Sequence, residues 1–397
     1  MHSENIRFIK LDTRVIERFD EALCGRCETV HTSIVAILSA LVKRHGPIYA
    51  ARALYSAVVR RNDEIVSLVA GNVLRKKIRL PALFGNPLIS RFYAAIKGVQ
   101  ATLLLDVLTD RLAHQDKDQL VAIIFNGSLF PESILGRATH GFRRVFVESG
   151  FFPNTLQIDA KGVNAANSVP RTKEFYLSGP DFASAGLPPN TVAVRRPKRE
   201  YPARDMRPGY VFVPFQVPSD MQVTVHSPWI RDMYQFYDLV IEQAETFPDD
   251  TFVIKEHPSF KLSVVGSRPS HPRIIFANGN PTGQLIMNSR SVMTLNSTVG
   301  IEALLSGKQV ITLGDACYNI QDLVLHTPDR KQLNKALEMR DWLPDERLRR
   351  QFLGFLWNRY LVKGGYLSFP PNLADEILAR CGPTGAGGLQ DVAMPHP

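Results

Sequence analysis

The chain has 397 residues, of which 45% are hydrophobic and 21% charged, an ordinary composition for a soluble globular protein of more than one domain. Its net charge of +9 favours anionic partners such as nucleotide sugars or anionic lipid surfaces; the basic residues are scattered and lack interleaved aromatic residues, which argues against nucleic-acid binding. No apolar run approaches the ~18 residues that span a bilayer, and Met1–Asn5 opens no apolar signal core, so we expect a cytoplasmic protein.

The first 115 residues or so are predicted to be mostly helical. Apolar residues at three- and four-residue spacing predict helices at 35–42, 48–59 and 101–112. Cys24 and Cys27, with His31 beyond them, offer fewer than the four ligands that a structural zinc site normally uses. We therefore expect no metal site here and interpret the cysteines as reduced thiols.

Short β-branched or aromatic runs predict strands at 120–125 and 144–147, each followed by a turn. A polar stretch from about 178 to 209, rich in glycine and proline, has the composition of an interdomain linker and contains the basic run Arg195–Arg199. These features predict an N-terminal domain over residues 1–195.

The second half alternates strands and helices, which predicts a parallel sheet with helical crossovers. We expect a domain over 205–370 that ends in C-terminal helices, followed by a disordered tail over 382–397. One predicted helix is capped by Ser227, and another is stopped by Gly307. The expected strands are 211–215, 252–254, 273–276, 292–295 and 309–313, and the expected helices are 228–246 and 299–305.

Four polar motifs follow the ends of predicted strands. In α/β proteins ligands bind beyond the carboxyl ends of the strands, so we expect these motifs to converge on one cleft. Two Rossmann-like domains facing each other across a cleft form the GT-B glycosyltransferase architecture, and this is the fold that we predict. The motifs are Glu148-Ser149-Gly150, Gln216 to Asp220, Lys255 with His257-Pro258, and Asn296-Ser297-Thr298.

Two of the motifs suit a phosphate-activated substrate. Ser297 is a good helix cap, and the free amides of a helix start favour a phosphate. Glu302, one turn further, can hydrogen-bond the ribose hydroxyls of a nucleotide; the alternative is an ordinary capped helix with a solvated Glu302. His257, held in direction by Pro258, can donate to a phosphate and assist a leaving group, or it is a structural histidine.

Two carboxylates suit transfer chemistry. Asp220, in a turn just past a predicted strand, is a candidate nucleophile or base, with Glu148 of the other domain as its partner. Transfer that retains anomeric configuration can use two carboxylates about 5 Å apart. The alternatives are that Asp220 only caps a helix and that Glu148 is a turn residue.

The order of these motifs resembles the capsule polysaccharide biosynthesis family, which includes the Kps-type (KpsS- and KpsC-like) Kdo transferases. The resemblance covers roughly residues 120–320 and implies a GT-B fold. It also implies a retaining β-Kdo glycosyltransferase that uses CMP-β-Kdo without a metal or other cofactor. The segments that carry it are Glu148–Gly150 with Pro153, 162–171, 214–220, Lys255 with His257-Pro258, and 296–304.

The resemblance assigns the nucleophile to Asp220, the acid/base to Glu148 and a catalytic histidine to His257. Lys255 and Arg171 are added by charge alone, and Asn164, Asn167 and Ser168 either bind sugar hydroxyls or stabilise their own loop. The full set of predicted substrate and nucleotide contacts is Gln216, Lys255, Asn296, Ser297, Thr298, Glu302, Asn164, Asn167, Ser168 and Arg171.

Alternatives stay open for function and location. The chain can be another GT-B transferase with a CMP- or CDP-activated donor, of the sialyltransferase or CDP-glycerol type, or a non-catalytic capsule assembly or export factor. The expected acceptor is lipid-linked or a glycan. Basic and aromatic residues over 340–363 form either a solvated helix face or a peripheral contact with the cytoplasmic face of the inner membrane, beside other capsule assembly proteins.

Overall fold

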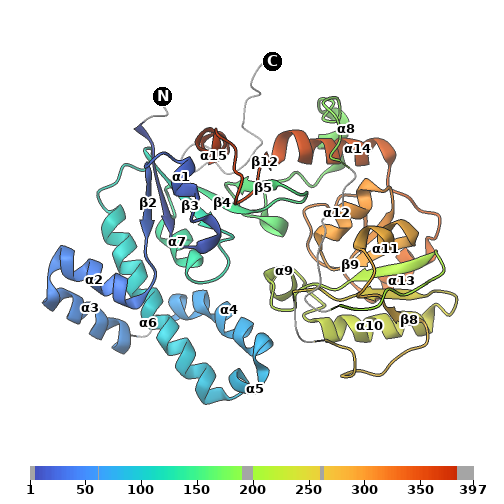
Figure 1. Cartoon of the computed structure of the whole chain (residues 1–397), viewed down its shortest axis with the longest axis horizontal. Helices are drawn as coiled ribbons and strands as arrows, with labels where there is room; N and C mark the ends of the chain where they lie inside the picture. The colour runs from blue at the N-terminus through green and yellow to red at the C-terminus, as the bar shows by residue number, and fades with distance from the viewer. Residues whose placement is uncertain (1–4, 61, 190–199, 260–262, 382–397) are drawn as a thin grey trace. The chain divides into compact units, whose positions relative to one another are not determined.

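The computed structural model describes residues 5–60, 62–189, 200–259 and 263–381, which form two compact units with a six-stranded sheet each (Figure 1). Unit 1 contains the described residues of Met1–Gly150, Asn154–Ser168 and Val362–Pro397. Unit 2 contains those of Phe151–Pro153 and Val169–Leu361. The prediction of two Rossmann-like domains with C-terminal helices is confirmed, and the cleft stays a prediction.

The unit boundaries differ from the predicted domains 1–195 and 205–370. Helix α8 (Lys173–Ser178) belongs to unit 2, because its Tyr176 packs against aromatic rings of α14 (Glu346–Phe355). Beyond residue 361 the chain returns to unit 1, where β12 (Val362–Lys363) pairs with β5 (Thr155–Asp159). Composition marks polar segments but carries no information on which sheet a segment joins. The Arg195–Arg199 run and the tail 382–397 lie outside the described residues.

The sheet of unit 1 has the order β12-β5-β4-β3-β1-β2. Its strands β2, β1, β3 and β4 are parallel, whereas β5 and β12 are antiparallel to their neighbours. The predicted strands near 120 and 144 are confirmed as β3 and β4. The first four strands are β1 (Arg7–Leu11), β2 (Cys27–Val30), β3 (Leu120–Phe125) and β4 (Arg143–Ser149).

The N-terminal segment is mostly helical, as predicted, and it also contains strands β1 and β2, which the sequence pattern did not predict. Strand β1 lies inside the sheet and is buried on both faces, so it lacks the alternation of a half-buried strand. Its short apolar run is also interrupted by Lys10, a fully buried side chain that forms an ion pair with Asp20 at 3.3 Å. A charged residue within a five-residue strand hides the strand from pattern analysis.

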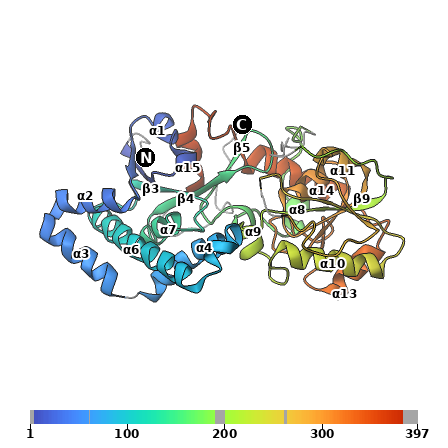
Figure 2. The ribbon, with the colours of Figure 1, turned by 60° about the horizontal axis from the view of Figure 1, so that its bottom comes forward.

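Helices cover both faces of this sheet. On one face, α1 (Phe19–Ala22) and α15 (Leu373–Cys381) share a core with β3 and β4. On the other, the core includes the second half of α6 (Pro87–Leu112) together with α7 (Glu132–Ala138). Four further helices lie beside α6 (Figure 2). They are α2 (Ile34–His45), α3 (Pro47–Val59), α4 (Asp63–Arg79) and α5 (Pro81–Phe84).

The three predicted N-terminal helices are confirmed, and the third is only the end of α6, a helix of 26 residues. By length and composition α6 is apolar enough to cross a membrane, which corrects the expectation that no segment reaches that length. Its buried residues Leu103, Leu104 and Leu108 belong to the core of unit 1. This half of α6 is therefore a core helix of an α/β unit.

The sheet of unit 2 has the order β8-β7-β6-β9-β10-β11 with every pair parallel, which confirms the predicted parallel sheet. The chain runs from β6 outward to β8 and then from β9 outward in the other direction. The reversal of strand order therefore falls between β6 and β9. The strands are β6 (Tyr210–Pro214), β7 (Phe252–Lys255), β8 (Ile274–Phe276), β9 (Ser289–Thr294), β10 (Gln309–Thr312) and β11 (Leu325–His326).

The crossover helices of unit 2 begin at capping residues. Helix α10 starts five residues later than predicted, because Asp232 rather than Ser227 caps it; the Ser227 hydroxyl donates to the carbonyl of Ile230 instead. Helix α12 is followed by Gly307 at φ +66°, as predicted. The helices of unit 2 after α8 are α9 (Met221–Thr224), α10 (Met233–Thr246), α11 (Thr282–Asn288), α12 (Thr298–Leu305), α13 (Arg330–Glu338), α14 and the π-helical segment Leu356–Tyr360.

Candidate active site

The loops after β6 and β9 are joined at the point where the strand order reverses. Gln216 Nε2 donates to Asn296 Oδ1 at 2.9 Å, and the Asn296 amide N–H donates to Gln216 Oε1 at 3.3 Å. Asn296 Nδ2 also donates to the carbonyls of Gln222 at 2.8 Å and His226 at 2.9 Å. Both amides were predicted to contact substrate; the structure uses them to hold the two loops together.

Asp220 lies at the carboxyl end of β6 and caps α9. Its Oδ1 accepts the amide N–H of Gln222 at 3.0 Å, so the helix-cap alternative is correct for this oxygen. The side chain is exposed, and among the described residues no donor is bound to Oδ2. A cap that uses one oxygen orients the carboxylate and leaves the other oxygen open to a ligand, so capping and nucleophilic attack are compatible.

The sequence predicted Arg171 as a substrate contact but gave no indication of His226. The imidazole of His226 is half-buried; burial lowers its pKa below the ordinary 6.5, Asp315 and Asp220 oppose that shift, and Arg171 adds to it. His226 is thus close enough to both Asp220 and Arg171 for their charges to act on it. It follows no predicted strand, so the motif argument could not find it.

The start of α12 has the predicted cap. Ser297 Oγ accepts the amide N–H of Val299 at 3.2 Å, and Thr298 is the first helical residue. The hydroxyl of Tyr318, a residue that was not predicted, donates to the Ser297 carbonyl at 2.5 Å. Glu302 is only 2% exposed, so the alternative of a solvated Glu302 is wrong.

Lys255 is the last residue of β7 and His257 comes two positions later, but the two side chains have different partners. His257 Nδ1 lies 3.3 Å from the Ser259 amide nitrogen and 2.8 Å from the Ser259 hydroxyl, and a ring that accepts at Nδ1 has Nε2 available to donate to a phosphate. Lys255 is buried, and its ammonium donates to the main-chain carbonyls of Asn278 at 3.0 Å and Asn280. These hydrogen bonds give Lys255 a structural role, and its contact with an anion stays a prediction.

Glu148 lies in unit 1. It is the next-to-last residue of β4, whereas the sequence predicted that it follows the strand. Its carboxylate accepts three hydrogen bonds, from Asn126 Nδ2 at 2.8 Å, Ser149 N at 2.9 Å and the Tyr366 hydroxyl at 3.3 Å. Burial and the charge of Glu148 raise the pKa of Tyr366, so this phenol keeps its proton and donates. Glu148 is held as an acceptor, the role that a general base needs.

The third residue of the Glu-Ser-Gly motif, Gly150, is a glycine for a steric reason. The strands β4 and β5 are antiparallel here, and the amide N–H of Gly150 donates to the Thr155 carbonyl at 2.7 Å. A Cβ at Gly150 would lie 2.0 Å from Thr155 Oγ1, closer than real Cβ contacts allow. Glycine therefore permits the tight return of the chain next to Glu148.

The predicted sugar contacts after β5 have local partners. The Asp159 carboxylate accepts the Ser168 amide at 2.8 Å and its hydroxyl at 2.7 Å. Asn164 pairs with the side chain of Gln157 through two hydrogen bonds of 2.8 Å. Ser168 and Asn164 therefore stabilise their own loop, and their contact with sugar hydroxyls stays a prediction. Asn167 is buried in the same loop, and its contact with a sugar stays a prediction.

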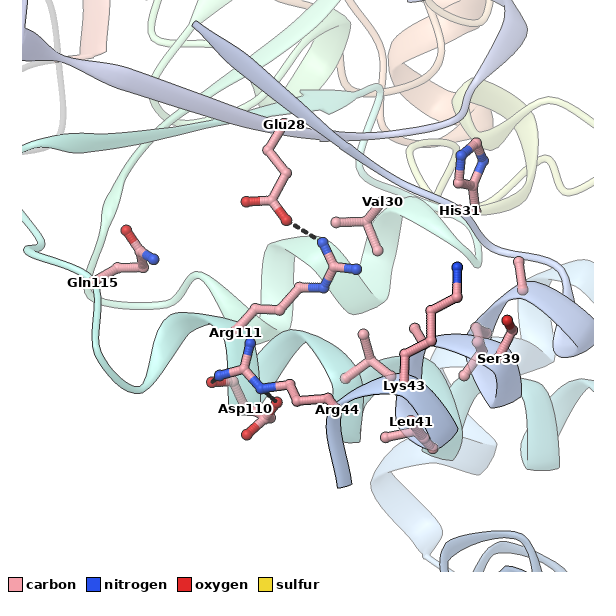
Figure 3. A pocket seen from close by; sticks show the side chains of 14 residues that line it. Glu28, Val30, His31, Ser39, Leu41, Lys43, Arg44, Asp110, Arg111 and Gln115 are labelled. Carbon is pink, nitrogen blue, oxygen red and sulfur yellow. Dashed lines mark hydrogen bonds and ion pairs between the residues drawn. The ribbon is translucent and has the colours of Figure 1, made fainter. Parts of the chain in front are cut away.

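A separate cavity of about 580 Å³ lies beside β2, α2 and α6 in unit 1, and the predicted catalytic and binding residues do not line it (Figure 3). Two of the cations that line it, Arg111 and Arg44, are paired with Glu28 and Asp110 respectively. Cys27 of β2 does not line the cavity, and burial raises the pKa of its thiol to about 12, which keeps it protonated. Over residues 5–60, 62–189, 200–259 and 263–381, no group of three or more His, Cys, Asp or Glu side chains could hold a metal ion.

The predicted residues fall into two sets. Asp220, Ser297 and His257 follow three strands of one parallel sheet, at its carboxyl edge. Glu148 lies at the corresponding edge of the other sheet. The separation of about 5 Å between the two carboxylates stays a prediction.

A parallel sheet with a capped helix start and an open carboxylate at its reversal point, together with a second Rossmann-like unit, defines a GT-B-like α/β protein. Residues 193–342 match the family described as capsule polysaccharide biosynthesis protein. Protein FixF of Sinorhizobium fredii is 59% identical over 375 residues, which are 94% of this chain and 93% of FixF. The chain belongs to the capsule polysaccharide biosynthesis family.

More distant relatives carry names from the same process. The capsule polysaccharide export protein KpsS of Escherichia coli is 24% identical over 57% of this chain and 73% of KpsS. Among solved structures, the KpsC β-Kdo 2,7 transferase of Thermosulfurimonas dismutans is 15% identical over 88% of this chain and 89% of that chain, with a TM-score of 0.41. A TM-score of this size is too low to carry a functional argument.

Proposed function

We propose that this chain is a glycosyltransferase of capsular polysaccharide biosynthesis, acting in the cytoplasm on a nucleotide-sugar donor and a glycolipid or glycan acceptor. The finer proposal is transfer of Kdo with retention from CMP-β-Kdo, without a metal or other cofactor. One observation carries it: Asp220 presents an open carboxylate oxygen at the reversal point of a parallel sheet, next in the sheet to the strand that leads into the capped start of α12.

The first step forms a bond between Asp220 and the anomeric carbon while the bond from that carbon to the CMP phosphate breaks. The free amides at the start of α12 favour the departing phosphate, and His257 Nε2 can donate to it. Glu302 is placed one turn further for the ribose hydroxyls. This step leaves a sugar ester on Asp220 and releases CMP.

The second step replaces the ester with the acceptor. A hydroxyl of the acceptor attacks the anomeric carbon, Glu148 takes up the hydroxyl proton, and the Asp220 carboxylate is released. Each displacement inverts the configuration at that carbon, so the two together retain it. Kdo itself carries a carboxylate, and Arg171, whose guanidinium acts on the same imidazole as Asp220, is the cation that we assign to it.

The test is mass spectrometry of the intact protein after mixing with CMP-Kdo. We expect an added mass of one Kdo residue on the wild-type chain and none on Asp220→Asn, since asparagine also caps helices and should preserve the fold. Asp232→Asn is the matched control, because Asp232 caps α10 in the same way. An adduct that persists in Asp220→Asn would contradict the assignment of the nucleophile.

The relative KpsS is named as a capsule polysaccharide export protein, which favours a second candidate, a non-catalytic capsule export or assembly factor. Under that alternative, Asp220→Asn would leave capsule formation intact in cells, whereas the transferase predicts its loss. A panel of donors separates the remaining enzymes: turnover only with CMP-sialic acid or CDP-glycerol would replace Kdo by another substrate class.

A further inference from the structure

The net charge of the chain is concentrated in one helical segment. Residues 34–97 contain 11 Lys and Arg but only two acidic residues, Asp63 and Glu64, which gives this segment a net charge of +9. The formal net charge of the whole chain is also +9, so the rest of the protein is neutral overall. The segment consists of α2 to α5 and the first half of α6.

The same segment exposes large apolar side chains. Of the 22 large hydrophobic side chains that are exposed among the described residues, 14 lie between Val35 and Ile96. On α6, Leu88, Phe92 and Ile96 recur every four residues and so share one face of the helix. Leu88 is 72% exposed and Phe92 70%. The contact of such large apolar side chains with water is unfavourable in free energy.

A groove of about 740 Å³ lies between the end of α3, α4 and this half of α6. Aliphatic side chains dominate its lining, which contains three cations, Arg60, Lys77 and Arg91, and no carboxylate. Within the part of the chain that the structure describes, these three cations form no ion pair. We call the groove and its three cations, together with Leu88 and Phe92 of the same half of α6, the basic apolar face.

Apolar side chains beside unpaired cations are complementary to one kind of surface, the headgroup region of an anionic bilayer. Acyl chains remove the apolar side chains from water, and lipid phosphates neutralise the cations. A nucleic acid would satisfy the charge but leave the aliphatic groove in water. Because the second half of α6 is built into the core of unit 1, the segment suits contact along the bilayer surface better than a span.

We propose that the basic apolar face docks the protein on an anionic phospholipid bilayer, with Leu88 and Phe92 entering the acyl boundary and Arg60, Lys77 and Arg91 contacting lipid phosphates. This surface replaces the 340–363 stretch as the membrane contact, since Phe352 and Phe355 there are buried in unit 2. The proposal goes beyond the proposed function and does not need it, because lipid binding requires no donor sugar.

The test is co-sedimentation of the full chain with vesicles of phosphatidylcholine, with and without phosphatidylglycerol. We expect binding only to the anionic vesicles, with an affinity that falls as salt is added. The triple variant Arg60→Gln, Lys77→Gln, Arg91→Gln should bind about 100-fold more weakly, from about 1 kcal/mol per cation at an anionic surface. Leu88→Ser with Phe92→Ser should weaken binding by at least about 100-fold at unchanged charge, from about 1.5 kcal/mol or more for each buried apolar side chain.

The matched control removes three exposed cations from the other unit, Lys331→Gln, Lys335→Gln and Arg350→Gln. It carries the same loss of charge and should bind within a few-fold of wild type. An equal loss in this control, or equal binding to neutral vesicles, would overturn the proposal. So would a finding that the apolar variant abolishes self-association of the chain while vesicle binding is unchanged, since the face would then join two copies.

Discussion

At the scale of single residues, the three donors around Glu148 show how the fold prepares one carboxylate. Asn126 follows β3 and Tyr366 follows β12, so two different parts of unit 1 converge on the end of β4. The ring of Tyr366 packs against Phe19 and Phe125, which positions its hydroxyl. Tyr366 is therefore a positioning residue for the proposed acid/base.

Replacing Tyr366 with phenylalanine keeps the ring contacts and removes one donor from Glu148. We expect transferase turnover to fall about tenfold, because one hydrogen bond to a charged group contributes roughly 1.5 kcal/mol. Tyr176→Phe is the control, since its buried hydroxyl donates to the Pro170 carbonyl at 2.7 Å in unit 2. Equal turnover in wild type and Tyr366→Phe would remove Tyr366 from the site.

Glu132 is a buried carboxylate of unit 1, at the start of α7. Burial raises its pKa from 4.5 to about 7, and hydrogen bonds from Thr13 and the Phe125 amide oppose that shift together with the charge of Lys10, while Asp12 adds to it. A carboxyl whose folded-state pKa is raised keeps its proton where the unfolded chain has lost it. Its contribution to stability is present below pH 4.5 and is lost as the pH rises through about 7.

The variant Glu132→Gln should remove this pH dependence. Between pH 5 and pH 8 we expect the free energy of unfolding of wild type to fall relative to the variant by up to roughly 3 kcal/mol, from about 1.4 kcal/mol per pKa unit. Chemical denaturation at the two pH values measures it, with the exposed Glu245→Gln as the control. A parallel response of wild type and Glu132→Gln would show that Glu132 does not titrate in this range.

At the scale of elements, α12 depends on a glycine that lets a tyrosine approach. A Cβ at Gly300 would lie 2.5 Å from the hydroxyl oxygen of Tyr318, which donates to the Ser297 carbonyl. The buried phenol therefore holds the loop that presents the helix start, and the glycine makes room for it. This gives the Ser-Thr-Val-Gly pattern a structural reason besides the proposed binding of a phosphate.

Gly300→Ala should displace Tyr318 and lower the free energy of unfolding by about 1–3 kcal/mol, the usual effect of overpacking. Donor binding, measured by calorimetry with CMP, should weaken at the same time because the helix start shifts. Gly136→Ala in α7 is the control: its Cβ would meet only Ile124 Cδ1 at 3.8 Å, and alanine favours a helix. A Gly300→Ala protein as stable as wild type would contradict the close packing.

At the scale of the whole molecule, the two units divide the proposed work. Unit 2 carries the reversal point with Asp220, and its range contains the segment that matches the family, residues 193–342. Unit 1 carries Glu148 and the basic apolar face, both outside that segment. Vesicle binding tests the surface of unit 1, and the sugar adduct tests unit 2, so failure of either leaves the other standing.

Much of the architecture could be predicted from local pattern. The alternation of strands and helices predicted the parallel sheet of unit 2, and Ser297 and Gly307 were placed correctly at the two ends of α12, because caps and helix stops depend on a few neighbouring residues. Strand β1 was missed, because its buried Lys10 depends on an ion pair with Asp20, a residue outside the strand. The end of unit 1 was also misplaced, because the pairing of β12 with β5 joins segments that are far apart in the chain.

The sequence by itself determined the two α/β units, the motif order and the family to which the chain belongs. Only the tertiary structure decided which side chains meet. Tyr366 donates to Glu148 across 218 positions of the chain, and Lys255 donates to main-chain carbonyls. His226 lies close enough to Asp220 for the charge of Asp220 to act on it. Periodicity and capping are local consequences of how a segment is buried. Partners far apart in the chain depend on how sheets and helices pack, which no short pattern encodes.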